Sequence, residues 1–258
     1  MGRMKWVVLA AAMVAVAAGC KALKATESAQ REEAAKLQQV VRFGKHEVKP
    51  ELNVFNGDTQ RQEAYAAAWG TAVNGVLNVL MQFARIPDTE MRSELELLGA
   101  RLGGYVGGNA YYAQVPAGAK PHDFAKAGAI AVVPIEPLWK VSNVLLGSNL
   151  PEWVDRGGGQ VEVVFSWFPN VDAAFVKRHL AQRRCKVVNV SESFSTATVV
   201  LPQREVMALA AEQWVQHVGP VAPPMELFNE GGVQRSGNPR GVDVDGLRKR
   251  RQGTVKKD

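Results

Sequence analysis

Alternating apolar and polar residues predict a strand at the start of two similar segments of the chain, residues 75–87 and 159–169. Successive side chains of a strand point to opposite faces, so every second residue of such a pattern is expected to be buried. Asn78 and Gln82 fall on the other face of the first strand. The expected buried positions are Leu77, Val79, Met81 and Phe83 in the first strand and Val161, Val163, Phe165 and Trp167 in the second.

A helical spacing of apolar residues follows each of these strands. Residues 88–104 carry acidic residues in the first turn and Gly103 as a stop signal. Residues 170–184 begin with Asn170, which can act as the N-cap. The expected buried stripes are Met91, Leu95, Leu98 and Leu102 in the first helix and Ala173, Val176 and Leu180 in the second.

Both segments then continue in the same order, with a strand, a short helix and a closing strand. Pro116 corresponds to Pro202 and Val79 to Val163, an offset of about 85 residues that indicates a tandem duplication. The alternative is chance agreement between common elements. The strands are expected at 105–116, 129–137, 186–202 and 215–224, and the helices at about 123–127 and at 203–214, with Val206, Leu209 and Ala210 facing inward.

The sequence therefore predicts an α+β fold with two tandem β-α-β-α-β units of ferredoxin-like type. The first unit spans residues 70–140 and the second spans 159–224, joined by a linker at 141–158. Four apolar residues in and next to this linker, Trp139, Leu145, Leu146 and Trp153, are expected to pack between the units.

The N-terminus has the pattern of a signal peptide over residues 1–19, with Arg3 and Lys5 before an uncharged apolar run of 14 residues, 6–19. This run is too short to cross about 30 Å of hydrocarbon. It ends in Ala-Ala-Gly-Cys, which resembles the bacterial lipobox and implies lipidation of Cys20 and anchoring in the cell envelope. The alternative is an ordinary cleaved signal followed by an incidental cysteine.

The segment that follows, residues 20–60, has the composition of a polar helical tether followed by a loop. Lys21 directly after the cysteine favours the outer membrane, facing the periplasm or the cell surface, by its similarity to known sorting patterns.

Charge and cysteine content exclude several classes of protein. The net charge of +6 comes from the signal and from the tail at 240–258, because residues 20–239 hold 22 basic and 22 acidic side chains. A neutral body gives no indication of a nucleic-acid partner. With Cys20 lipidated, Cys185 is the one remaining thiol and no internal disulfide can form. The four histidines lack partners at metal-binding spacing, so neither a metal nor a cofactor is expected.

Several short segments resemble the N-terminal prodomains of subtilisin-like serine peptidases (subtilases), across about 70–245. They are GNAYYAQVP (108–116), AIAVVPIEPLWKVS (129–142), SFSTATVVLP (193–202) and ALAAEQWVQHVGPVAPPMELFNEG (208–231). The chain departs from the family pattern at Gly219-Pro220, where Glu-Pro is common, and at Asn229-Glu230 in place of Asn-Asp. None of the peptidase triad strings Asp-Ser/Thr-Gly, His-Gly-Thr or Gly-Thr-Ser-Met-Ala occurs, so peptidase activity is not expected.

The resemblance implies a non-catalytic protein that binds, inhibits or chaperones a subtilisin-like peptidase. The open sheet face would pack on the enzyme, and the extended segment 221–230 would lie along its substrate cleft. Two alternatives are the front end of a subtilase precursor without independent activity and a structural scaffold of the envelope. The expected tail, 225–258, is extended, basic and disordered. The candidate cleft contacts are Pro223, Pro224, Met225, Leu227 and Phe228.

Overall fold

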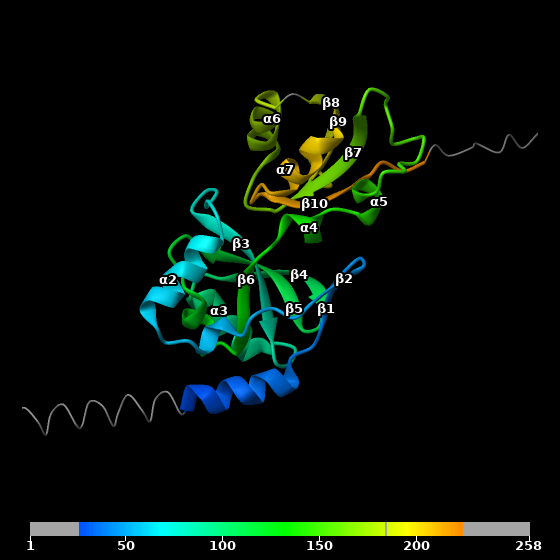
Figure 1. Ribbon diagram of the computed structural model, residues 1–258. Coiled ribbons are helices and arrows are strands. Elements are labelled where there is room, and N and C mark those ends of the chain that lie inside the picture. Colours follow the sequence, from blue (N-terminus) through cyan, green and yellow to red (C-terminus); the bar gives the residue numbers. More distant parts are fainter. Residues whose placement is uncertain (1–25, 184, 224–258) are drawn as a thin grey trace, which may run out of the picture. The chain divides into compact units, whose positions relative to one another are not determined.

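A computed structural model describes residues 26–183 and 185–223 of the chain (Figure 1). These residues form two four-stranded antiparallel sheets with helices, and a small two-stranded sheet. The α+β class predicted from the sequence is therefore confirmed. Both large sheets belong to one compact body that ends at Ala222.

The first unit contains a sheet in the strand order β4-β5-β3-β6. Every neighbouring pair of strands in it is antiparallel. Its elements are β3 (Val76–Phe83), α3 (Thr89–Leu97), β4 (Arg101–Gly107), β5 (Ala110–Pro116), the 3-10 helix η2 (Pro121–Phe124) and β6 (Ala129–Pro134).

The second unit repeats this arrangement with the strand order β10-β7-β9-β8. Its neighbouring strands are also antiparallel. Its elements are β7 (Gln160–Trp167), α6 (Ala173–Ala181), β8 (Lys186–Ser191), β9 (Thr196–Pro202), η3 (Gln203–Glu205), α7 (Val206–Ala210) and β10 (Val215–Pro220).

Each unit has the order β-α-β-β-α-β, and not the predicted β-α-β-α-β, because the middle strand of the prediction is a hairpin. In the first unit the turn consists of Gly108 and Asn109, which both have positive φ, at 58° and 56°. Two successive residues of this kind fit a tight two-residue hairpin turn. In the second unit the turn spans residues 192–195 and includes Ser195 at φ 49°. The sequence prediction overlooked both turns.

The two units match each other in strand register as well as in element order. Leu77 of β3 pairs with Val115 of β5, and Val161 of β7 pairs with Leu201 of β9. Val161 comes 84 residues after Leu77, and Leu201 comes 86 residues after Val115. The pairing with the last strand of each sheet is interrupted at the same place, after Gln82 in β3 and after Ser166 in β7. Bulges are specific features of a strand pair, so a shared one supports the tandem duplication.

The helices that follow β3 and β7 are shorter than predicted and are capped alike. Asp88 accepts a hydrogen bond from the Met91 amide at the start of α3, and Asp172 accepts one from the Phe175 amide at the start of α6. Asp172, and not Asn170, is therefore the N-cap of α6. Gly99, with φ of 76°, follows the end of α3 four residues before the predicted stop.

The segment predicted as a tether and loop is folded against the first unit. Residues 26–37 are helical, and a second helix, α2, spans Thr59–Ala68. Asp58 caps α2 by accepting hydrogen bonds from the Gln60 and Arg61 amides. Between the two helices lie β1 (Val41–Phe43), β2 (His46–Val48) and the 3-10 helix η1 (Asn53–Phe55).

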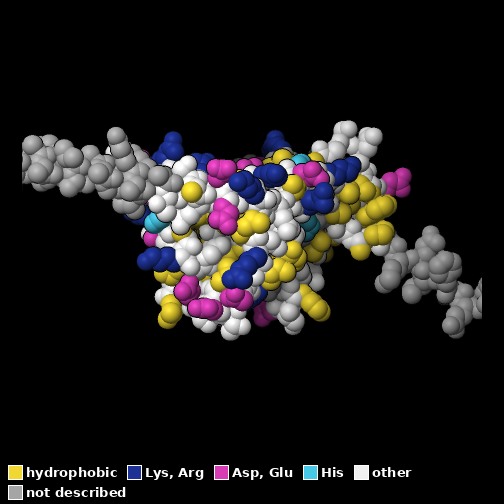
Figure 2. All heavy atoms as spheres, turned by 90° about the horizontal axis from the view of Figure 1, so that it is seen from below, with side chains coloured by type: hydrophobic (Ala, Val, Ile, Leu, Met, Phe, Trp, Pro, Cys, Tyr) yellow, Lys and Arg dark blue, Asp and Glu magenta, His cyan; other side chains and the backbone are white. Residues whose placement is uncertain are grey.

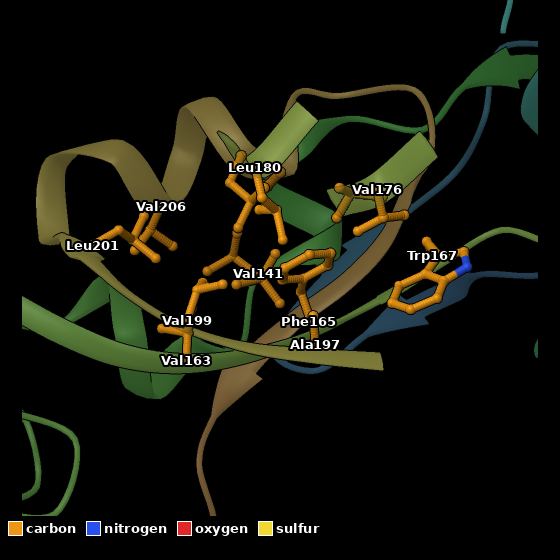
Figure 3. Packing of buried hydrophobic residues seen from close by; sticks show 14 of the residues in the cluster. Val141, Val163, Phe165, Trp167, Val176, Leu180, Ala197, Val199, Leu201 and Val206 are labelled. Carbon is orange, nitrogen blue, oxygen red and sulfur yellow. The ribbon is translucent and has the colours of Figure 1, made fainter. Parts of the chain in front are cut away.

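Each unit has its own hydrophobic core beneath its helices. In the second unit, Val176 and Leu180 of α6 and Val206 of α7 point toward the sheet (Figure 3). The inward stripes predicted for β7, α6 and α7 are all buried, which confirms those assignments. In the first unit, Leu95 and Phe124 cover the four apolar residues of β3 that were expected to face the core, while Leu98 is exposed and Leu102 is only partly buried.

The linker carries two short helices, α4 (Pro137–Lys140) and α5 (Asn143–Leu146). Of the four residues expected to pack there, Leu145 is buried in the second core and Trp139 stacks on Phe43 of β1, with ring centroids 5.1 Å apart. Leu146 and Trp153 are exposed instead.

Candidate functional site

The two equivalent sheets differ in the face that lies opposite their helices. On this face β3 presents Asn78, Leu80 and Gln82, which are at most 1% exposed. The corresponding residues of β7 are partly exposed. They are Glu162, Val164 and Ser166. The same face is thus covered in the first unit and accessible in the second.

The N-terminal segment covers one end of the first face through Gln82. The Gln82 side-chain amide donates to the main-chain oxygen of Gln39 at 2.7 Å and to that of Gly108 at 2.8 Å. Its oxygen accepts a hydrogen bond from the Gln38 side chain at 2.9 Å. All hydrogen-bonding groups of this buried amide are therefore satisfied within the chain.

Segments from β1 and the second unit cover the rest of this face. Leu80 packs in a cluster with Val41 and Phe43 of β1 and with Phe168, which directly follows β7. The Asn78 side chain donates to Asn170 Oδ1 at 3.1 Å and to the Gln213 main-chain oxygen at 2.9 Å. Buried polar contacts of this kind hold the second unit on the first in one specific arrangement.

The accessible face of the second sheet, here called the free sheet face, is made of small and β-branched side chains. Val164 lies between Gly219 of β10 and Thr198 of β9 in the register. Neither Val164 nor Val200 belongs to any of the hydrophobic clusters of the described residues. The face comprises His217 and Gly219 of β10, Glu162, Val164 and Ser166 of β7, Thr196, Thr198 and Val200 of β9, and Lys186, Asn189 and Ser191 of β8.

Three titratable groups, Glu162, Lys186 and His217, lie on the free sheet face. Glu162 forms an ion pair with Arg156 at 2.6 Å, so its carboxylate is neutralised within the chain. His217 lies opposite Ser166, and burial lowers the pKa of its imidazole. The side chains between these groups, Val164, Thr198 and Ser166, are uncharged, which favours contact with a weakly charged surface of a partner.

A buried lysine links the linker to the loop after α7. Lys140 is 2% exposed, and its Nζ donates to the Glu212 main-chain oxygen at 2.9 Å. Burial lowers the pKa of the Lys140 ammonium group to about 8, against the opposing effect of the Glu212 carboxylate. The Glu212 side chain also forms an ion pair with Arg183. Because these contacts join the linker to the second unit, we assign Lys140 a structural role.

Two large surface hollows in the described part of the chain have few side chains that could take part in catalysis. The larger, about 910 Å³, lies between the helix at 26–37 and the first unit and has largely apolar walls that include Leu37, Phe55 and Ile130. The second, about 790 Å³, contains His179 and Glu136. His179 stacks on Phe175 and its Nδ1 lies 3.0 Å from the Phe175 oxygen, so that nitrogen is already engaged.

The described residues contain no group of three or more His, Cys, Asp or Glu side chains that could hold a metal ion. Cys185 is half-buried, and burial raises the pKa of its thiol while Arg183 opposes the change. An unactivated thiol of this kind is a poor nucleophile. Figure 2 shows a face on which Lys and Arg side chains lie among Asp and Glu side chains, without a patch of one sign.

Most of the site residues predicted from the sequence lie outside the described residues. These are Cys20, Pro224, Met225, Leu227 and Phe228. Pro223 is described and is exposed, three residues after the end of β10. Across residues 26–183 and 185–223, no helix is both long enough and apolar enough to pass through a membrane.

The resemblance to subtilase prodomains implied an open sheet face as the docking surface, but the sequence did not show which of the two sheets keeps this face accessible. The pattern of β7 predicts an outward face, but β3 has a similar pattern and its outward face is covered. The one available signal was the pair of amides in β3, because Asn78 and Gln82 are the residues that bond to the covering segments.

One family model matches the chain. Its description is Domain of unknown function (DUF8729), and it matches residues 42–136. This range begins in β1 and ends just after β6, so it includes nearly all of the β1-β2 pair together with the whole first sheet. No curated protein and no solved structure matches the chain.

Proposed function

We propose that the protein is a non-catalytic binding protein that docks the free sheet face of its second unit on a subtilisin-like serine peptidase. The single observation that carries this proposal is the contrast between the two sheets. The same face is covered by the chain itself in the first unit and left accessible in the second. The target class comes from the resemblance of the chain to subtilase prodomains.

The topology of both units supports the ferredoxin-like part of the proposal. In each sheet the order of the strands is fourth, first, third, second, counted along the unit. An antiparallel sheet in this order, with both helices on one side, is the split β-α-β arrangement of ferredoxin-like folds. Such a unit leaves one sheet face available for another partner, which in the first unit is this chain's own N-terminal segment.

The free sheet face suits a partner that presents helices. Val164, Thr198 and Val200 are short and stiff, so they form an even surface and lose little side-chain entropy on binding. An even apolar surface can accept the ridges of a packed helix. The first unit would act as a support for the second, since its own face is occupied.

The chain that follows β10 provides the second contact. Val221 packs partly on the second core, and Pro223 comes two residues later at the surface. We propose that residues 221–230 lie along the substrate cleft as an added strand, whose main-chain hydrogen bonds give affinity. Proline limits the freedom of the unbound segment and so lowers the entropic cost of binding. Specificity would come from Met225, Leu227 and Phe228.

A lipid on Cys20 would hold this binding protein at the cell envelope. Diacylation provides about 0.8 kcal/mol per buried methylene, which is enough for stable attachment when two chains insert. Mass spectrometry of the mature N-terminus tests this part of the proposal, because an unmodified Cys20 thiol would contradict it.

Inhibition of subtilisin-like peptidases tests the proposed activity. Residues 21–258 are assayed against a panel of these enzymes with a small chromogenic substrate, and sub-micromolar competitive inhibition is expected. Val164→Arg on the free sheet face and Phe228→Ala in the tail should each weaken inhibition about tenfold or more. The control is Ile86→Arg, at an exposed position of the first unit.

Two results would contradict the proposal. A correctly folded chain that inhibits no member of the panel would exclude the peptidase as partner. Equal inhibition by Val164→Arg and the Ile86→Arg control would exclude the free sheet face as the docking surface, even if inhibition by the chain were observed.

A further inference from the structure

Three of the four sheet edges are met by other segments of this chain. In the first sheet, the Asn53 side chain makes two hydrogen bonds with the main chain of Val132 in β6, at 2.7 and 3.0 Å. In the second sheet, the equivalent residue of β10, Val218, accepts a hydrogen bond from the Ser142 amide at 2.8 Å. Both last strands are thus protected at the same position of the repeat.

The edge strand β4 of the first sheet also has a neighbour. β1 lies beside β4, and Val106 of β4 packs in the same cluster as Val41 of β1. The approach at the end of β4 is so close that a Cβ added to Gly108 would lie 2.4 Å from the Val40 oxygen. The end of β4 therefore has a neighbour, although residues 103–105 are exposed and no main-chain hydrogen bond joins β4 to β1 among the described residues.

The fourth edge, β8 of the second sheet, has only β9 as a strand partner among the described residues. Val187 and Val188 on this strand are exposed, Val188 at 50%. Phe194, in the turn that follows, is 80% exposed. A free edge with exposed apolar side chains offers unpaired main-chain groups to another strand. By position in the repeat β8 corresponds to β4, whose end lies beside β1.

We propose that β8 pairs in the antiparallel direction with β8 of a second copy of this chain, forming a two-fold symmetric dimer. The charges at the two ends of the strand favour this occupant. Lys186 is its first residue, and Glu192 follows its end. Antiparallel pairing places the basic start of each strand beside the acidic end of the other, whereas parallel pairing would bring like charges together.

The existing contacts of these charges leave them available to a second copy. Glu192 is paired with Lys177 at 3.0 Å, but both side chains are more than half exposed, and such pairs are weak. Lys186 is exposed as well. Phe194 lies beyond the end of β8, where it would meet the residues before the start of the partner strand.

The dimer would extend the second sheet to eight antiparallel strands and leave the free sheet face open. A two-fold axis perpendicular to the sheet places both free sheet faces on the same side. The chain would then present two docking surfaces next to each other, which increases avidity for any clustered partner. The inference does not depend on the proposed peptidase partner, since it concerns an edge and not the face.

Sedimentation velocity of the full chain in a mild detergent tests the dimer over concentrations from about 2 to about 200 µM. The dimer is expected to appear as concentration rises. Val188→Lys should shift the monomer–dimer midpoint at least about tenfold to higher concentration, because it places a charge at the pairing edge. The control is Leu97→Lys, at an 88% exposed position of α3, which should leave the midpoint unchanged.

A charge exchange distinguishes a second copy from any other partner. Lys186→Glu and Glu192→Lys should each weaken the dimer, and the double variant should restore it, because the two charges meet only between copies. Asn189→Cys, combined with Cys185→Ser, should form an intermolecular disulfide, while Leu97→Cys in the same background should not.

Three results would overturn the inference. They are a chain that stays monomeric over the whole range, equal midpoints for Val188→Lys and Leu97→Lys, and a double charge variant no stronger than the single ones. Circular dichroism of each variant confirms that it is folded, so that loss of the dimer is not loss of structure.

Discussion

Replacing Lys140 with methionine measures the cost of burying an ammonium group between the linker and the second unit. Lys140 is 2% exposed, and burial lowers its pKa from 10.5 to about 8. Between these two pH values the unfolded chain binds a proton that the folded chain has released. Stability linked to Lys140 therefore rises with pH across this window, by about 3 kcal/mol at about 1.4 kcal/mol per pKa unit.

Below about pH 8 Lys140 is charged in both states, and the full cost of burial is present. Lys140→Met removes the charge and keeps a side chain of similar length. At neutral pH the variant should thus gain stability from the lost burial penalty, offset in part by the lost hydrogen bond to the Glu212 oxygen. This advantage over the wild type should shrink by about 3 kcal/mol as pH rises from about 7 to above 10.

Urea unfolding followed by tryptophan fluorescence at several pH values provides the measurement. The control is Lys45→Met, because Lys45 is exposed and its removal should leave the pH dependence of the wild type unchanged. A constant difference between Lys140→Met and the wild type over the whole pH range would refute the reasoning, since it would show that Lys140 titrates alike in both states.

Three further changes have effects that follow from single contacts. Asn78→Ala should lower the free energy of unfolding by about 1 to 3 kcal/mol, because it removes two hydrogen bonds from a buried side chain to half-buried groups of the second unit; a loss below about 0.5 kcal/mol would contradict this. Asp172→Ala should cost about 1 kcal/mol as a lost N-cap, and Asp88→Ala a similar amount. Burial lowers the pKa of His217, so stability should fall with pH below about 6.5, less steeply in His217→Gln; parallel pH curves would exclude this.

Strand alternation in the sequence was enough to locate β3 and β7, because both strands have one face in a core. Val161, Val163 and Phe165 are all buried as predicted. The repeated order of elements was also visible, since the corresponding elements keep their spacing along the chain. The hairpins were not predicted although Gly108-Asn109 favours a two-residue turn, because strand-like residues continue on both sides of it.

The candidate site could not be derived from the sequence in the same way. Alternation tells which residues of a strand share a face, but it does not tell what covers that face. Gln82 of β3 and Ser166 of β7 occupy the same place in the repeat, and Gln82 is buried while Ser166 is partly exposed. The difference comes from residues 38–43 and from Phe168, which reach the first sheet from distant parts of the chain.

The sequence by itself thus determined the α+β class, the repeated order of elements and the inward faces of β3, β7, α6 and α7. These depend on local spacing, because period and side-chain chemistry select the element and its buried side. Tertiary structure alone decided which sheet face is covered, that the edges at β6 and β10 are hydrogen-bonded to other segments, and that Lys140 is buried. Coverage of a sheet face and burial of a charge depend on contacts between residues far apart in the chain, and such contacts cannot be predicted from the local sequence pattern.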